Sequence, residues 1–337
     1  MNDKNRDKTL EELLTELGET DASVKSALIY RLSDLDTMDI AVIKSHWQSI
    51  PDERRLTLFS RLAETSETNF EVDFTAISLF ALNDEDPEVR MHAIGTLWFN
   101  NDPEVMRRFI RMLETDESSD VRAAAAEALG NFVLSGELGD LPEAVGHEAE
   151  EALLAALNIQ YETLLVHRRA LESLAYSERE EVPDLILSAY EHNDIGMQAS
   201  AVFSMGRSAD NRWKRNVIEG LDSAVPEIRY EAARAAGELG LSRAISRLMR
   251  MAEETSDREI QQAAIWSLGE IGGTEAQNAL LRLANHEIDE DLLEGIEDAI
   301  SMAQLASGSF SAIIFGDDDE IEDMVEFDEL DDEDEDY

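Results

Sequence analysis

The stretch from Ile228 to Gly240 reads IRYEAARAAGELG, and its pattern decides the fold of the chain. Apolar or small residues stand at the first position and at the fourth, seventh, eighth and eleventh positions after it: Ile228, Ala232, Ala235, Ala236 and Leu239. This spacing places them on one face of an α-helix. Because most of these residues are alanine, the pattern predicts a helix that approaches its neighbours closely.

Related phrases recur along the chain at steps of 30 to 35 residues, apart from one step of 45. We call the residue that opens each phrase its anchor, and the anchors are Val24, Arg54, Val89, Val121, Val166, Met197, Ile228, Ile260 and Leu292. Alanine recurs four residues after the anchor, at Ala93, Ala125, Ala170, Ala201, Ala232 and Ala264. A period of this length predicts a repeat architecture.

Each period has room for a second helix, such as PEVMRRFIRMLET from Pro103. A helix pair cannot bury its apolar face alone, so successive pairs are expected to stack into a solenoid over residues 1–304. Four glycines near the ends of phrases are expected to serve as left-handed helix caps: Gly130, Gly206, Gly240 and Gly269.

The phrases DPEVRMHAIGTL from Asp86, SDVRAAAAEALGNF from Ser119 and PEIRYEAARAAGELG from Pro226 resemble HEAT repeats, in particular the short repeats of phycobilisome lyases. The resemblance covers residues 20–304 and implies an all-α, right-handed α–α superhelix of about eight or nine helix pairs. It also implies that the helices formed by the phrases line the concave face. The family includes scaffolds, chromophore-lyase subunits, a di-iron hydroxylase and DNA-repair glycosylases, so the resemblance leaves the function open.

The step of 45 residues between Val121 and Val166 contains VLSGELGDLPEAVGH, which is rich in glycine and acidic residues. We interpret it as an inserted surface loop. The alternative is a bend or a binding loop in the middle of the array.

The chain carries a net charge of −47, and from Asp317 to Tyr337 fifteen of twenty-one residues are acidic and none is basic. Such a surface repels phosphate backbones, so we expect no nucleic-acid partner and favour a partner with a basic surface. No apolar run approaches the roughly 20 residues of a membrane span, and the start, MNDKNRDKTLEELLTEL, does not resemble a signal peptide. We therefore expect no membrane partner and a cytoplasmic location.

Candidate catalytic and metal-ligating residues are few. The chain has no cysteine, no HExxH motif and no phosphate-binding loop. The hydroxylase branch of the family holds iron through His-Glu pairs in its phrases, and His147-Glu148 matches one such pair, whereas Tyr230 takes the place of the histidine in a later phrase. One pair does not complete a site, so we predict no catalytic residue, no metal and no cofactor.

The face of each phrase opposite the buried stripe is the candidate binding surface. At 100° per residue this face holds the second, sixth and ninth positions after the anchor. In the C-terminal half it predicts a partner-binding groove rich in arginine and aromatic residues, which are common in interface hot spots: Arg168, Glu172, Phe203, Tyr230, Arg234, Gln262 and Trp266. The alternative is that Phe203 and Trp266 pack between helices as core.

The segment from Gly206 to Arg250 has a local excess of basic residues, with nine basic residues and six acidic ones. We predict a basic patch made of Arg212, Lys214, Arg215, Arg243 and Arg247. The arginine that follows the anchor recurs as Arg90, Arg122 and Arg229, and we expect it to form bonds within or between repeats.

The C-terminal residues form two further segments, a linker with an apolar cluster at 305–316 and an acidic segment at 317–337, which is expected to be disordered. Apolar residues among the acids indicate docking points: Phe310, Ile314, Phe315, Met324 and Phe327. The alternative is a solubilising tail without a partner.

Together these features predict a protein-binding scaffold with a concave groove, whose acidic arm attracts basic partners or docks on the groove of its own chain. The alternative function is an accessory or lyase-type subunit that acts on a tetrapyrrole–protein pair, and a DNA-repair enzyme is the third. Copurification of a coloured chromophore would distinguish the second of these from the first.

Overall fold

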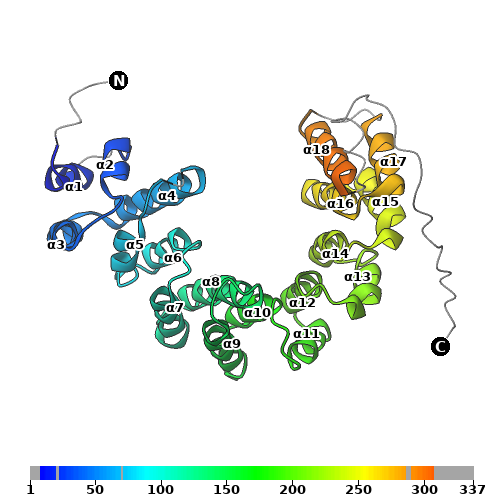
Figure 1. The fold of residues 1–337 in the computed structure, drawn as a ribbon, viewed down its shortest axis with the longest axis horizontal. Helices are drawn as coiled ribbons and strands as arrows, with labels where there is room; N and C mark the ends of the chain where they lie inside the picture. Colours follow the sequence, from blue (N-terminus) through cyan, green and yellow to red (C-terminus); the bar gives the residue numbers. More distant parts are fainter. Residues whose placement is uncertain (1–7, 20–22, 70, 286–289, 307–337) are drawn as a thin grey trace, which may run out of the picture.

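The computed structural model describes residues 8–19, 23–69, 71–285 and 290–306. Every regular element in these ranges is helical, and the eighteen α-helices follow one another in an open arc (Figure 1). The expected all-α solenoid of stacked helix pairs is therefore confirmed. None of the helices in the described ranges combines the length and the apolar character that a bilayer crossing requires.

The helices lie in two layers from α6 onward (Figure 1). From α4 onward, the even-numbered helices lie on the inner side of the arc and each packs against the next: α4 Asp52–Thr68, α6 Pro87–Thr96, α8 Ser119–Glu137, α10 Leu164–Leu174, α12 Ile195–Arg207, α14 Pro226–Glu238, α16 Arg258–Ile271 and α18 Glu290–Ala306. From the Arg54 anchor onward the recurring phrases form these inner helices, as expected, whereas the phrase anchored at Val24 gives only the short helix Ser26–Arg31.

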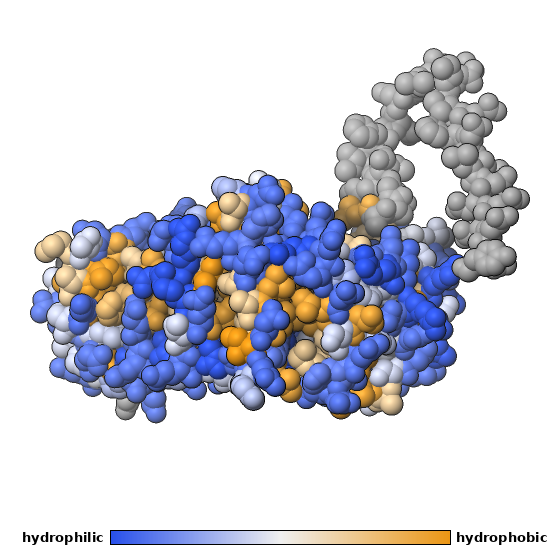
Figure 2. Space-filling model, turned by 90° about the horizontal axis from the view of Figure 1, so that it is seen from below, coloured by the Kyte–Doolittle hydropathy of each residue, from blue (hydrophilic) through white to orange (hydrophobic). Residues whose placement is uncertain are grey.

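The remaining helices form the outer layer and the N-terminal end of the arc. They are α1 Leu10–Glu19, α2 Ser26–Arg31, α3 Thr37–His46, α5 Thr75–Ala81, α7 Pro103–Thr115, α9 Glu143–Leu157, α11 Val182–Tyr190, α13 Lys214–Gly220, α15 Ile245–Glu254 and α17 Gly273–Ala284. Seen from the convex side, hydrophobic residues form separate patches among hydrophilic ones (Figure 2).

The core lies between the two layers and is built from the phrase positions that the sequence marks. The six alanines at the fourth position after the anchor have no exposed surface. Asp86 and Asp102 accept a backbone N–H at the starts of α6 and α7, each before a proline in the first helical turn. Local capping and helical spacing therefore specify these helices.

The arginine that follows the anchor connects successive loops. Arg90 donates to the carbonyl of Asp84 at 2.8 Å and to both carboxylate oxygens of Asp116 at 2.6 and 2.8 Å. Arg122 repeats this arrangement, with the carbonyl of Asp116 at 2.8 Å and the carboxylate of Glu162 at 2.7 and 2.8 Å. Arg229 donates to the carbonyl of Ser223 at 2.9 Å. The predicted bonds within and between repeats are confirmed.

Three of the four glycines expected as helix caps have a different role. Gly240 has the positive φ of a left-handed cap, but Gly130, Gly206 and Gly269 lie inside α8, α12 and α16. Each contacts the next inner helix so closely that an added Cβ would lie about 3 Å or less from it, at Ser173, Ala235 and Ala299 respectively. The cap prediction was wrong there because these glycines serve helix–helix contact.

The 45-residue step is largely helical, so its interpretation as an inserted surface loop was wrong. Helix α8 continues to Glu137 and α9 begins at Glu143, which leaves residues 138–142 as the link. Gly136 and Gly146 meet where these helices cross, and a Cβ on Gly136 would lie 2.9 Å from the Cα of Gly146. The glycines that suggested a loop allow the two longer helices to pack.

Candidate functional site on the inner helices

The inner surface of α10, α12, α14 and α16 carries the seven residues predicted for the groove. They occupy the second and sixth positions after each anchor; Gln262 is exposed and the other six are half-buried. The ninth position, also predicted to face the groove, is instead buried against the next inner helix, as at Gly206 and Gly237. The inner surface is therefore formed by the second and sixth positions after each anchor and continues on the side of the third and tenth positions, not on the side of the ninth.

A polar network joins α8, α10 and α12 across this surface. Arg168 donates through Nε to Ser200 Oγ at 2.9 Å, and that hydroxyl donates to Glu172 Oε1 at 2.5 Å. The second oxygen of Glu172 accepts from Arg169 at 2.5 Å, and Arg169 lies 3.6 Å from Glu127 on α8. These bonds fix both predicted residues of α10, Arg168 and Glu172.

Two of the three predicted aromatic residues, Phe203 and Trp266, each lie beneath an arginine. The guanidinium of Arg207 is 5.2 Å from the ring centre of Phe203, and that of Arg234 is 4.5 Å from the ring of Trp266 on the next inner helix. Both rings are half-buried, so they pack partly between helices and also keep an exposed part. At these distances each guanidinium is attracted to the face of the ring beneath it.

Glu231 of α14 feels the charge of two other acidic residues, Glu172 of α10 and Glu238 of its own helix. Burial raises the pKa of its carboxyl to about 7, and the nearby charge of Glu172 adds to this, while Arg234 and Arg168 oppose it. No hydrogen bond or ion pair to Glu231 occurs among the described residues. Its neighbour Glu238 also has a raised pKa, mainly through burial, although Arg207 lies 3.4 Å away.

Tyr230 and Glu231 line an open depression of about 590 Å³ near the starts of α12, α14 and α16, together with Arg168, Ile195 and Asp257. Gly196 allows the Arg168 guanidinium to approach the α12 backbone, because a Cβ there would lie 2.8 Å from it. The depression is therefore lined by charged side chains, by the ring of Tyr230 and by the apolar side chain of Ile195.

Sequence reasoning missed several residues that form or support this surface: Arg169, the buried Ser200, Arg207, Glu231 and Glu238. They occupy the third and tenth positions of their phrases. On a helical wheel these positions adjoin the sixth, so extending the predicted stripe toward that side would have found them.

Four of the five basic-patch residues lie together, and in the outer layer. Lys214, Arg215, Arg243 and Arg247 line a depression of about 870 Å³ on α13 and on the turn that leads into α15. Arg212 lines a different depression and pairs with Asp210 at 2.5 Å. The predicted groove and most of the predicted basic patch therefore lie on different sides of the array, because α13 and α15 are outer helices and α14 and α16 inner ones (Figure 1).

His147 and Glu148 contact different residues and do not act on a common neighbour. Glu148 lies 3.1 Å from Arg107 on α7, and the exposed ring of His147 lies 3.9 Å from Glu143 and from Glu150. Across the part of the chain that the structure describes, no group of three or more potential ligands is placed to hold a metal ion.

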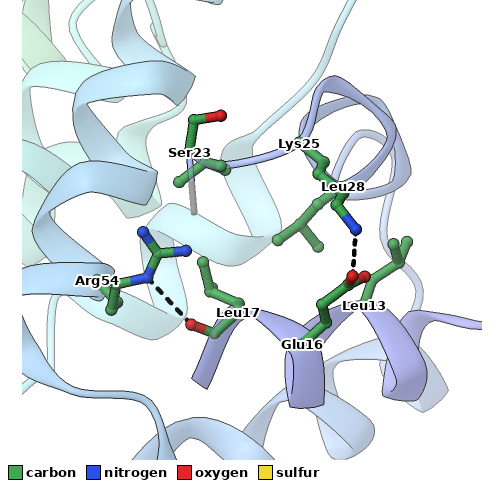
Figure 3. Close-up of a pocket in the computed structure, with 8 residues that line it drawn as sticks. Leu13, Glu16, Leu17, Ser23, Lys25, Leu28 and Arg54 are labelled. Atoms are coloured by element: carbon green, nitrogen blue, oxygen red, sulfur yellow. Dashed lines mark hydrogen bonds and ion pairs between the residues drawn. The ribbon is translucent and has the colours of Figure 1, made fainter. Parts of the chain in front are cut away.

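A pocket between α1, α2 and α4 is closed by Arg54, the least apolar of the anchors (Figure 3). Arg54 Nε donates to the carbonyl of Leu17 at 3.1 Å, and Lys25 pairs with Glu16 across the opening. Its volume of about 10 Å³ holds at most one water molecule. Arg54 thus has a structural role, and the pocket is too small for a ligand.

The predicted docking points of the C-terminal segments, Phe310, Ile314, Phe315, Met324 and Phe327, lie outside the described residues. The apolar cluster and the acidic segment therefore remain predictions from the sequence.

The comparisons with known proteins agree with the repeat pattern. The model of HEAT repeats matches residues 76–159 and 215–301. A comparison with curated proteins gave no match.

Among solved structures, the CpcE–CpcF complex of phycocyanin lyase from Nostoc is 16% identical over 68% of this chain and 94% of its own, with a TM-score of 0.44. YibA from E. coli is 15% identical over 85% and 98%, with a TM-score of 0.45. Importin beta is 15% identical over 90% of this chain and 46% of its own, with a TM-score of 0.46. At these values the likenesses carry no argument about function.

Proposed function

Because this chain belongs to the HEAT-repeat family, we propose that it is a scaffold that binds another protein along the inner surface of α10, α12, α14 and α16. The observation that carries the proposal is the pair of half-buried rings, Phe203 and Trp266, each beneath an arginine. Arginine, tryptophan and tyrosine are enriched among the residues that dominate binding energy. Here they lie on the inner side of a stacked array, where an extended partner can contact several repeats.

The charge of the surface favours a partner with basic residues. All four arginines on it have a partner: Arg168 contacts Ser200, Arg169 pairs with Glu172, and both Arg207 and Arg234 lie within 4 Å of Glu238. Glu231 has no cation within ion-pair distance in the described part of the chain. A lysine or arginine of the partner placed there would supply the missing charge. The acidic residues of 317–337 would add long-range attraction and speed the encounter.

The experiment compares proteins retained by the immobilised full-length chain with those retained by inner-surface variants. Trp266→Ala removes a ring, and Gln262→Arg adds a positive charge at an exposed position whose side chain forms no hydrogen bond with the described residues. Tyr161→Ala, at a ring that is 91% exposed and outside the inner surface, is the matched control.

We expect a retained protein that both inner-surface variants lose and the control keeps, and whose retention weakens as salt rises. Retention that is the same in all four proteins contradicts the proposal. A coloured chromophore that copurifies with the chain would instead favour a lyase-type subunit acting on a tetrapyrrole–protein pair.

A further inference from the structure

The outer depression between α13 and α15 is a cationic surface in a strongly acidic chain. Lys214 and Arg215 open α13, Arg243 lies in the single turn before α15, and Arg247 lies on α15. Ile218 and Leu241 lie between them, half-buried and buried respectively. Glu219 is the one carboxylate among the lining residues. Charges and apolar surface are thus combined in one depression.

Part of this positive charge is not neutralised by neighbours. Arg215 pairs with Glu219 at 2.8 Å and Arg247 with Asp222 at 3.0 Å. Lys214 and Arg243 are exposed and have no carboxylate within ion-pair distance in the described ranges. Two free cations beside two paired ones favour a ligand that brings several negative charges.

The chain itself contains a segment with matching chemistry. Residues 307–337 follow the last described helix, and 317–337 contain fifteen acidic residues with apolar residues between them, among them Ile321, Met324 and Phe327. Helix α18, which precedes the segment, packs on α16 and α17, and α15 packs on the same two helices. Thirty-one residues span up to about 100 Å when extended, so the segment can reach the depression within its own chain.

We propose that the depression between α13 and α15 binds the acidic segment 317–337 of the same molecule. The carboxylates pair with Lys214 and Arg243, and the interspersed apolar side chains cover Ile218 and Leu241. Because the segment is tethered, its effective concentration at the depression is high, and a modest affinity is enough to keep it bound. A basic partner then competes with the depression for the same carboxylates. The proposal does not depend on binding at the inner surface.

The distribution of lysines provides a direct test in the full-length chain. The sequence has lysine at 4, 8, 25, 44 and 214 and nowhere else. The first four precede or belong to α1–α3, at the opposite end of the arc from α15 (Figure 1). A carbodiimide joins a lysine amine to a carboxylate only where the two touch, so mass spectrometry of the cross-linked monomer shows which lysine meets the segment.

We expect peptides from 317–337 to be joined to Lys214 at least about tenfold more than to the four N-terminal lysines. The preference should disappear in 0.5 M NaCl, where the Debye length is about 4 Å. Equal coupling to all lysines overturns the proposal. Coupling to Lys214 only in the cross-linked dimer overturns it too, because the occupant is then a second copy.

Charge reversal with a matched control separates this site from general attraction. Arg215→Glu with Arg243→Glu changes two exposed residues of the depression and should reduce coupling at Lys214 at least about fivefold. Arg108→Glu with Arg111→Glu changes the net charge equally on the exposed face of α7 and should leave coupling unchanged. Equal losses in both variants contradict a specific site. Circular dichroism verifies that both variants remain helical.

Discussion

Glu231 makes the stability of the inner surface depend on pH. Burial, with Glu172 and Glu238 nearby, raises its pKa to about 7, against the opposing effect of Arg234 and Arg168. The folded chain therefore binds this proton more tightly than the unfolded chain does. The resulting stabilisation is fully present below the ordinary glutamate pKa of 4.5 and is lost as pH rises through about 7.

Glu231→Gln should remove this dependence. We expect the variant to equal the wild type at pH 4 and to exceed its unfolding free energy at pH 8 by at most about 3 kcal/mol. Denaturant unfolding from pH 4 to 8 measures the difference. Glu227→Gln, exposed on the same helix, is the control and should unfold like the wild type throughout. A constant difference at every pH would contradict the assignment of the raised pKa to Glu231.

A buried ion pair makes a second prediction at the residue scale. Arg55 on α4 is 2% exposed and lies 2.5 Å from Asp84, whose side chain is fully buried and also accepts from Trp47. Asp84→Asn leaves the arginine with less charge compensation and should destabilise this region by about 3 kcal/mol. Glu64→Gln, in the exposed pair with Arg61, should cost less than about 1 kcal/mol. Amide hydrogen exchange in α4 and α5 measures the loss of stability in both variants. Equal protection of these amides in the two variants would refute the prediction.

At the scale of helices, small residues set the distance between repeats. The ninth position of one inner helix meets the seventh position of the next: Gly130 with Ser173, Gly206 with Ala235, Gly237 with Ser267 and Gly269 with Ala299. Ser267 also donates to the carbonyl of Ala233 on the preceding inner helix at 2.6 Å. The same contact therefore recurs at four of the junctions between inner helices, from α8–α10 to α16–α18.

Gly237→Ala tests this contact. Its Cβ would lie 2.9 Å from the Cα of Ser267, and because backbone cannot move away cheaply, we expect a loss of about 1–3 kcal/mol. Gly295→Ala, inside α18 and with no atom near the added Cβ, should gain about 0.5–1 kcal/mol. Thermal midpoints of the two variants should move in opposite directions. A shift in the same direction would show that helix propensity, and not the contact, governs these sites.

The sequence correctly predicts those features that are determined by the residues within a single phrase. The period, the inner helices, the buried alanines and the arginines after the anchor all follow from local spacing and are confirmed. Gly206 and the ninth position were misassigned because their environment is the next helix, about thirty residues away. The raised pKa of Glu231 could not be predicted for the same reason, since it depends on burial between packed helices and on the charge of Glu172 in another repeat.

At the scale of the whole molecule, the two-layer arrangement explains why residues close in sequence have separate surfaces. Arg234 on α14 belongs to the inner side, whereas Lys214 and Arg243, on either side of it in sequence, belong to the outer one. Charge counted along the chain therefore merged two surfaces that the alternation of helices keeps apart. One array thus presents an inner surface with paired arginines and an outer one with free cations.

The net charge of −47 determines how the whole array responds to salt. Raising NaCl from 0.02 to 0.2 M shortens the Debye length from about 21 to about 7 Å. That change screens the repulsion between carboxylates of neighbouring repeats. Ion pairs in direct contact, such as Arg90–Asp116 at 2.6 Å, lose little of their attraction. Exposed pairs contribute less than about 1 kcal/mol each, so repulsion should dominate. We expect the thermal midpoint to rise by several degrees with salt at pH 7.5, and by less at pH 4, where carboxylates are partly neutral. Calorimetry measures both series, and a midpoint that falls with salt would show that the ion pairs outweigh the net charge.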